Sequence, residues 1–287
     1  MSTHLSELCA GGGVEPIIER LKQLCPARLA LEAEEVEDGV AAGFTREAHD
    51  RMHQTFGGVW GYQDDDGRTA LHWAVAMRNF SLASMLLSAP YCALACSEDH
   101  DGASPFITAC MVGAPEAFLT ELLTAAAEQR WWKLAERRAA VGAEAEAEST
   151  DGVEELVAEH TKAVVNQPDI HGNTPLLHSA GRGNIAMVRF LLNLGASIDQ
   201  QNKRGQSALH RSTGRGATDV VEELVSASKR THKPVEHRRW MNLQDYRGET
   251  ALFYASMDNN EELGRYLLRH GADRAIRNKE GKEFWEV

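Results

Sequence analysis

The segment DGRTALHWAVA at residues 66–76 recurs in altered form four more times along the chain. The related segments are DGASPFITACM at 101–111, HGNTPLLHSAG at 171–181, RGQSALHRSTG at 204–214 and RGETALFYASM at 247–257. Recurrence at intervals of a few tens of residues is typical of stacked repeats, in which neighbouring units bury a continuous core. The repeat therefore decides the fold class of this chain.

Each column of the repeat has a physical role. A glycine opens the unit and suits a turn with positive φ; it stands at 67, 102, 172, 205 and 248. A Thr or Ser two residues later, such as Thr69 or Thr174, can cap a helix with its hydroxyl. Pro105 and Pro175 follow that cap at the first helical position, where a missing N–H has no cost. We therefore expect a short helix to begin in each unit.

A second apolar segment follows in each unit and ends in an apolar doublet. The doublets are Leu86-Leu87, Leu122-Leu123, Leu191-Leu192, Leu224-Val225 and Leu267-Leu268. The glycine precedes the doublet by 19 residues in four units and by 20 in the other. The distance from the doublet to the next glycine varies widely, so the insertions fall in one loop of the unit.

A unit of 33 residues (Gly248 to Gly281), with a turn, a T-P-L-H-like start and two short helices, resembles the ankyrin repeat. The resemblance implies an all-α ankyrin-repeat solenoid of about six to seven repeats with helical and loop insertions. It also implies a structural role for His72 and His210, whose rings would bond to backbone and to the capping Thr or Ser.

The repeat phase predicts a single domain over 1–287 with seven parts. They are a degenerate capping repeat (1–34), an insertion (35–62), repeats two and three (63–127), a helical hairpin insertion (128–163), repeats four and five (164–227), a basic loop (228–241), and repeat six with a C-terminal half-repeat cap (242–287). Within the hairpin we expect Asp151 to cap the second helix. Trp131 and Trp132 are expected to pack the hairpin onto its neighbour, with partner binding as the alternative.

The charge is uneven along the chain. The net charge is −12, which argues against a general nucleic-acid binder. Residues 1–163 carry 12 basic and 27 acidic side chains, whereas residues 164–287 carry 18 and 15. The five cysteines form no CxxC pair, and neither a secretory signal nor an apolar run long enough to span a membrane is evident. We expect reduced thiols and a cytoplasmic location, with the nucleus as a second one.

No catalytic or metal-binding constellation stands out. Cys92, Cys96 and His100 are spaced by four, but they fall in a connector between units. Gly11–Gly13 lacks the following Lys-Ser/Thr of a phosphate-binding loop. We expect no enzyme activity, no cofactor and no metal ion.

The repeat phase also selects the residues that should face a partner. In repeats two and three these include Asp65, Arg68, Trp73, Met77, Asp101 and Met111. In repeats four to six they include His171, Arg182, Arg204, Arg211, Arg215, Tyr246, Arg247 and Tyr254. We expect Arg211 and Arg215 to lie on one first helix, to point together into the groove, and to leave the neighbouring repeats untouched. The first set is acidic and the second basic, which suits one protein partner with complementary patches; the alternative is that these charges only solubilise the face.

The segments QDDDGRTALHWAVA, ALHRSTGRG and NLQDYRGETALFYA resemble the gankyrin family of proteasome assembly chaperones. The resemblance implies a concave face that clamps the C-terminal domain of one proteasome ATPase subunit, in a chain that is a monomer when free. The matching positions are Asp65, Arg68, Trp73, Arg211, Arg215 and Tyr246. Leu94–Glu98 also fits the L-x-C-x-E pattern linked to that family, although so short a pattern can arise by chance.

The rival hypothesis is a generic ankyrin adaptor or scaffold, for instance one that binds a kinase or a ubiquitin-ligase component. A scaffold with another partner has no reason to need the Arg211 and Arg215 pair, so the charge of the groove discriminates between the two readings.

Overall fold

The computed structural model describes residues 5–11, 15–24, 62–88, 93–140 and 150–287. These residues form helices joined by loops, and the extended structure among them is one isolated bridge between Gln201 and Ser207. They divide into two units, Met1–Val164 and Val165–Val287 (units 1 and 2). The all-α prediction is confirmed for the described ranges, whereas residues 35–61 of the predicted insertion lie outside them.

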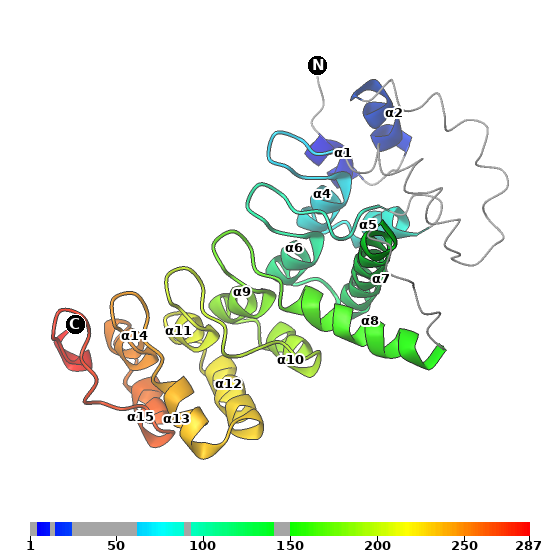
Figure 1. Ribbon diagram of the computed structural model, residues 1–287. Helices are drawn as coiled ribbons and strands as arrows, with labels where there is room; N and C mark the ends of the chain where they lie inside the picture. Colours follow the sequence, from blue (N-terminus) through cyan, green and yellow to red (C-terminus); the bar gives the residue numbers. More distant parts are fainter. Residues whose placement is uncertain (1–4, 12–14, 25–61, 89–92, 141–149) are drawn as a thin grey trace. The chain divides into compact units, whose positions relative to one another are not determined.

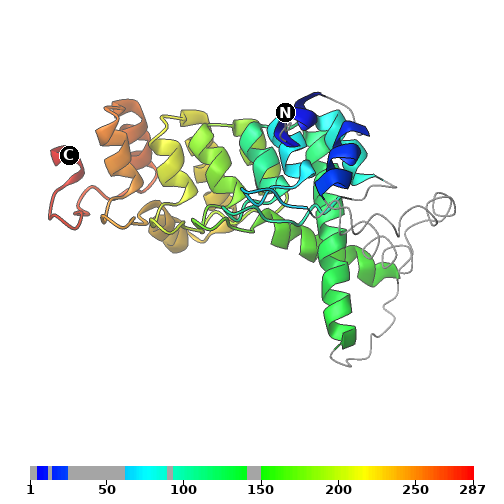
Figure 2. The same cartoon turned by 90° about the horizontal axis from the view of Figure 1, so that it is seen from above.

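Unit 1 stacks first helices against one another and second helices behind them (Figure 1). Its helices are α1 (Leu5–Gly11), α2 (Glu15–Leu24), α4 (Ala70–Ala76), α5 (Phe80–Leu87), α6 (Pro105–Val112), α7 (Glu116–Ala140) and α8 (Thr150–Val165, whose last residue belongs to unit 2). Helix α1 packs against α4 and α4 against α6, while α5 packs against α7. The long helix α7 projects beyond the other helices of this unit (Figure 2).

Unit 2 repeats the same arrangement. Its helices are α9 (Pro175–Arg182), α10 (Ile185–Asn193), α11 (Ala208–Thr213), α12 (Thr218–Thr231), α13 (Pro234–Met241), α14 (Ala251–Met257), α15 (Glu261–Arg269) and the 3-10 turn η2 (Phe284–Glu286). The first helices α9, α11 and α14 form one row, and α10 packs against α12 in the row behind.

The predicted capping residues begin the first helices. Thr69, Ser104 and Thr174 are N-caps whose side-chain oxygens accept the N–H three residues later, and Pro105 and Pro175 occupy the first turn. The glycine before each cap has φ between 69° and 79°, a region in which a side chain would be strained. The turn-and-cap chemistry expected from the sequence is therefore present.

The core consists of the repeat positions that carry apolar or small residues. The first residue of each doublet (Leu86, Leu122, Leu191, Leu224 and Leu267) is 0% exposed. The small residues Ala74, Ala109, Ser179, Ser212 and Ala255 are buried as well, which lets the adjoining helices approach closely.

His72 and His210 join one repeat to the next. The Nδ1 atom of His72 lies 2.9 Å from Thr69 Oγ1, and its Nε2 atom lies 3.1 Å from the carbonyl oxygen of Ala103. His210 makes the equivalent contacts with Ser207 Oγ (2.8 Å) and the Glu249 carbonyl (3.1 Å). Since a carbonyl only accepts, Nε2 carries the proton and Nδ1 accepts. The structural role expected for both histidines is confirmed.

The prediction of a basic loop at 228–241 is wrong, because helix α12 continues to Thr231 and α13 covers Pro234–Met241. The buried Trp240 holds α13 in place and donates its Nε1–H to the carbonyl of Ile198 at 3.0 Å. Most basic side chains of this segment are exposed. Their number favoured a loop in the sequence, and the importance of the buried Trp240 was therefore missed.

The region of the predicted hairpin also differs in detail. Helix α7 runs without a break across residue 128, so the second helix of repeat three continues into the insertion. Helix α8 begins at Thr150, which places Asp151 inside the helix rather than at its cap. The packing predicted for Trp131 and Trp132 concerns side chains outside those that the structure describes.

We predict that acidification destabilises the fold through these buried histidines. Burial lowers the pKa of both His72 and His210, against the raising effect of the carbonyl contacts. The unfolded chain therefore binds more protons below the ordinary histidine pKa of about 6.5, and the stability present above that pH is lost as the pH falls toward the lowered folded values. Each histidine adds at most about 1.4 kcal/mol per pH unit to the slope.

Urea unfolding at about pH 7.5 and about pH 5.5 measures this effect. The variant His210→Gln should be less stable at both values but should lose less stability between them. An unchanged pH dependence in this variant would contradict the assignment.

Candidate functional site

The loop that opens each repeat, which we call the finger, is held by one carboxylate or amide. The residue three positions before the finger glycine accepts the backbone N–H groups two and four residues later, at 2.8–3.1 Å. These residues are Asp64, Asp99, Asp169, Asn202, Asp245 and Asn278. This column of Asp and Asn was not predicted from the sequence, although it stands out when the repeats are aligned from three residues before the glycine.

Neighbouring fingers in each unit are joined by a backbone hydrogen bond. In unit 1 the N–H of His100 donates to Asp66 O at 3.0 Å. In unit 2 the equivalent bonds are Lys203 N to His171 O (2.9 Å), Tyr246 N to Arg204 O (3.0 Å) and Lys279 N to Arg247 O (2.8 Å). This ladder fixes the spacing between the side chains at the finger tips.

The partner-facing residues predicted in unit 1 divide into anchored and exposed ones. The Trp73 indole donates to Asp64 Oδ2 at 2.6 Å, and the Arg68 guanidinium lies 4.9 Å from the Trp73 ring centre and 3.3 Å from Asp99 Oδ2. Both side chains therefore stabilise the fingers. The remaining four are Asp65, Met77 and Asp101, which are exposed, and Met111, which is half-buried.

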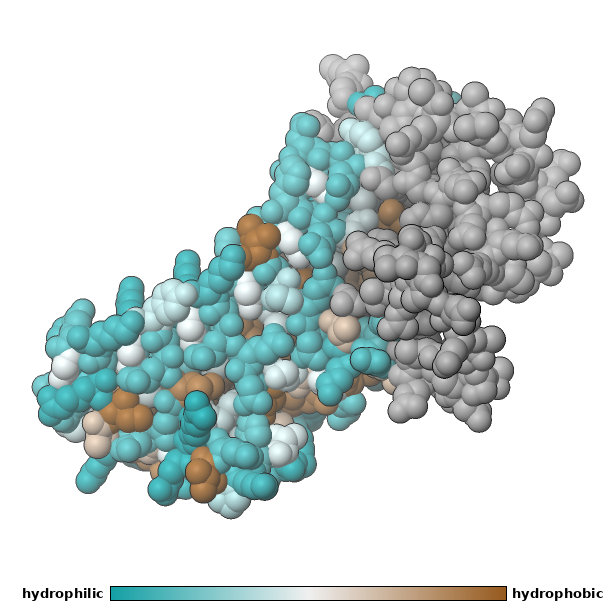
Figure 3. All heavy atoms as spheres, viewed as in Figure 1, coloured by the Kyte–Doolittle hydropathy of each residue, from teal (hydrophilic) through white to brown (hydrophobic). Residues whose placement is uncertain are grey.

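Unit 2 presents exposed basic side chains and one tyrosine on its fingers, at the end of α9 and just after α11. His171, Arg182, Arg204, Arg215, Tyr246 and Arg247 are all exposed, with Tyr246 at 63%. The face of unit 2 that Figure 3 shows is mainly hydrophilic with scattered hydrophobic residues. We call these six residues the cationic finger set.

Arg211 is placed differently from the prediction. Its Nη1 donates to Asn173 Oδ1 in the preceding repeat at 3.0 Å, and a Cβ added to Gly181 would lie 2.7 Å from Arg211 Nε. Burial lowers the pKa of this guanidinium, which stays charged all the same. The expectation that Arg211 leaves its neighbours untouched is wrong, and because α11 ends at Thr213, Arg215 does not share its helix.

Tyr254 is half-buried, and its hydroxyl both donates and accepts a hydrogen bond. Its hydroxyl donates to Asp245 Oδ2 and accepts from Gln206 Nε2, both at 2.8 Å. Burial raises the pKa of Tyr254 to about 12, so the phenol stays protonated. Tyr254 and Arg211 are thus parts of the scaffold as well as of the predicted surface.

The described residues hold no group of three or more His, Cys, Asp or Glu suited to a metal ion, and Cys92 lies outside them. Cys96 donates its thiol to the carbonyl of Ala126 at 2.9 Å, and the adjacent Ala95 is buried. The segment Leu94–Glu98 is therefore tied down against α7. Within the described ranges no helix combines the length and apolarity needed to cross a membrane.

We predict that Gly205→Ala destabilises the chain more than Gly281→Ala. Both glycines have similar positive φ, 74° and 77°, so both variants carry the same left-handed strain of about 1–2 kcal/mol. A Cβ at 205 would lie 2.9 Å from Asp245 Cα in the next finger, whereas nothing lies within 4 Å of one at 281. The clash should cost about 1–3 kcal/mol more.

Urea unfolding of the two variants and the wild type gives this difference directly. Equal losses would show that the finger ladder tolerates the methyl group and does not constrain its spacing.

Comparison with known families identifies the repeat. A model described as ankyrin repeats (3 copies) matches residues 141–237, and the single ankyrin-repeat model matches residues 66–97 and 247–279. Among solved structures, the ankyrin repeat domain of Bcl-3 has a TM-score of 0.58 and 20% identity, and the match covers 98% of this chain and 92% of that one. This likeness concerns the fold.

The curated relatives differ in how much of their own length matches this chain: two match over a small part and one over most of it. A Caenorhabditis elegans homologue of transient receptor potential cation channel subfamily A member 1 is 31% identical over 126 residues, 44% of this chain but 10% of the relative. The Legionella pneumophila phosphocholine transferase AnkX is 27% identical over 49% of this chain and 15% of its own length. A Saccharomyces cerevisiae protein named "Probable 26S proteasome regulatory subunit p28" is 25% identical over 78% of this chain and 80% of its own. The repeats, their fingers and these matches show that the chain belongs to the ankyrin-repeat proteins.

Proposed function

We propose that this chain is a non-catalytic protein-binding module that acts as an assembly chaperone of the proteasome regulatory particle. Its fingers and first helices would hold the C-terminal domain of one proteasome ATPase subunit. The observation that carries this proposal is the likeness to the p28 protein, which extends over 78% of this chain and 80% of that one. The channel and transferase relatives match over 10% and 15% of their lengths.

The charge of unit 2 supports a protein partner with an acidic patch. The cationic finger set places four exposed arginines, His171 and the exposed Tyr246 on unit 2. Arginine and tyrosine are enriched in protein interfaces. The acidic residues Asp65 and Asp101 in unit 1 would meet basic groups of the same partner.

The second candidate is an adaptor for another protein. The same repeats occur as small parts of functionally different relatives, which favours a general binding scaffold. The two candidates differ in the partner that is captured from a native lysate, and mass spectrometry of the eluate identifies it.

We predict that Arg204→Glu combined with Arg215→Glu weakens binding to a purified proteasome ATPase C-terminal domain by at least about tenfold. Both side chains are exposed, so the fold should persist. The charge-matched control is Arg269→Glu with Arg274→Glu, which alters two exposed residues, the last residue of α15 and one in the loop that follows it. Calorimetric titration at two salt concentrations measures the affinity, and wild-type binding should weaken as salt rises.

Wild-type protein that does not bind the domain would exclude the chaperone proposal. Equal binding by the finger variant and the control would retain the partner but remove the cationic finger set from the interface.

A further inference from the structure

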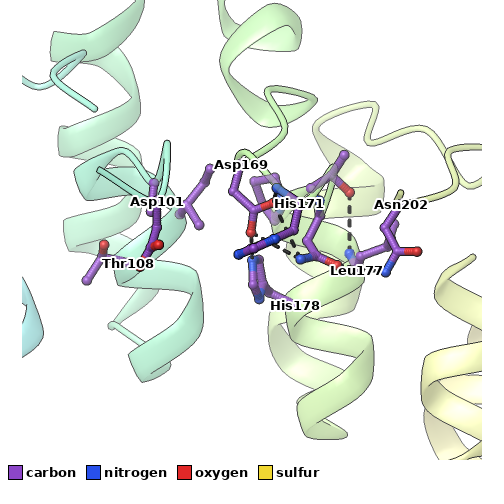
Figure 4. A network of polar contacts seen from close by, with 12 residues as sticks. Asp101, Thr108, Asp169, His171, Leu177, His178 and Asn202 are labelled. Carbon is purple, nitrogen blue, oxygen red and sulfur yellow. Dashed lines mark hydrogen bonds and ion pairs between the residues drawn. The ribbon is translucent and has the colours of Figure 1, made fainter. Parts of the chain in front are cut away.

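In unit 2 the side chains of three consecutive repeats form one continuous chain of hydrogen bonds, part of which Figure 4 shows. The bonds run from Asn173 Nδ2 to Asp169 Oδ2 (3.1 Å), from Asn202 Nδ2 to Asn173 Oδ1 (2.9 Å) and to Gln206 Oε1 (3.2 Å), from Gln206 Nε2 to Tyr254 Oη (2.8 Å), and from Tyr254 Oη to Asp245 Oδ2 (2.8 Å). We call this chain the amide relay. Asn173, Asn202 and Asp245 are each 8% exposed, so water competes little for these bonds.

The relay has a fixed direction. Its two ends, Asp169 and Asp245, are carboxylates that only accept hydrogen bonds. At its centre the Oδ1 atom of Asn202 already accepts the N–H groups of Arg204 and Gln206. The amide nitrogen of Asn202 must therefore donate in both directions. Between it and the two ends, Asn173, Gln206 and Tyr254 each accept on one side and donate on the other.

The relay also touches the three side chains that stand six residues after the finger glycines of repeats four, five and six. His178 Nε2 lies 2.8 Å from Asp169 Oδ2, Arg211 Nη1 donates to Asn173 Oδ1 at 3.0 Å, and Tyr254 is itself a member. All three are half-buried on first helices. Their orientations therefore depend on one shared set of donors and acceptors.

We propose that Asn202 is a positioning residue whose amide group, by donating in both directions, fixes His178, Arg211 and Tyr254 in one arrangement on the binding face of unit 2. The inference rests on the proposed function in that this face meets a protein partner. It accounts for Asn rather than Asp at 202 in the finger column, which holds Asp at 64, 99, 169 and 245 and Asn again in the last finger, at 278.

Aspartate at 202 would serve the finger equally well, because a carboxylate oxygen accepts the same two N–H groups. Its second oxygen, however, would face the acceptor atoms Asn173 Oδ1 and Gln206 Oε1. Asn173 could restore a bond only by turning its own NH2 toward residue 202, which would withdraw it from Asp169 and move its oxygen away from Arg211. A change at one finger would thus propagate to side chains of two other repeats.

The test is Asn202→Asp in the full chain, studied by side-chain NMR. We expect the Arg211 Nε–H, His178 ring and Tyr254 ring signals to shift together. We also expect the pKa of His178, which burial now lowers, to rise because Asp169 loses a donor. The control Asn278→Asp makes the same change in the last finger, where the side-chain amide of Asn278 hydrogen-bonds to Glu249, and it should leave the Arg211 and His178 signals unmoved.

A second variant, Gln206→Glu, tests the direction of the relay. It keeps an acceptor toward Asn202 but removes the donor toward Tyr254, so Tyr254 should shift while Arg211 and His178 keep their wild-type signals. This variant also tests the direction of the hydrogen bonds in the relay if Asn202→Asp fails to fold. Signals of Arg211, His178 and Tyr254 that respond to neither variant would overturn the inference, as would a shift of all three in Gln206→Glu.

Affinity separates the positioning role from the proposed function. Asn202→Asp should bind the proteasome ATPase C-terminal domain about tenfold more weakly, the loss expected from displacing a charged hydrogen-bonding group. If the signals move and the affinity does not, the positioning role in binding is wrong and the chaperone proposal stands. If the wild type does not bind that domain, the chaperone proposal fails and the NMR results alone decide whether Asn202 sets the three side chains.

Discussion

The bond from a finger carboxylate or amide to two backbone N–H groups is the interaction on which the rest of the structure depends. A turn whose N–H groups lacked partners would be costly to bury against its neighbour. With Asp64, Asp169 or Asp245 accepting both, the glycine can hold its positive φ and the next finger can approach to backbone contact. The ladder of fingers then sets the distance between repeats at which the leucine core packs.

The same residues connect the scaffold with the surface. Trp73, His178 and Tyr254 each donate to the finger carboxylate nine residues earlier, so side chains at equivalent positions of three repeats are held rigidly. Rigid groups lose little entropy when a partner binds. In the proposed binding face, the exposed arginines of the cationic finger set would attract acidic groups of the partner, and the half-buried Trp73, His178 and Tyr254 would keep a fixed arrangement beneath them.

The insertion between repeats five and six falls between two repeat units, as the sequence predicted, but it is helical, whereas its basic residues had suggested a loop. The additional residues between repeats five and six extend α12 and build α13, which Trp240 anchors through its bond to Ile198. Burial of the Trp240 side chain favours the helix, whereas the basic side chains remain in water in the helix and in a loop alike. The buried tryptophan therefore decides the local structure.

The sequence by itself determined the all-α class, the repeat, the caps at Thr69 and Thr174, the structural histidines and the buried columns. Each of these depends on local chemistry that recurs with a fixed period. Only the tertiary structure decided what Arg211 contacts, that Asn202 donates to Asn173 in the preceding repeat, and that Trp73 and Tyr254 bond to the finger carboxylates. Those roles come from partners 9 to 48 residues away in the chain, and a linear pattern does not specify which donor meets which acceptor across a repeat boundary.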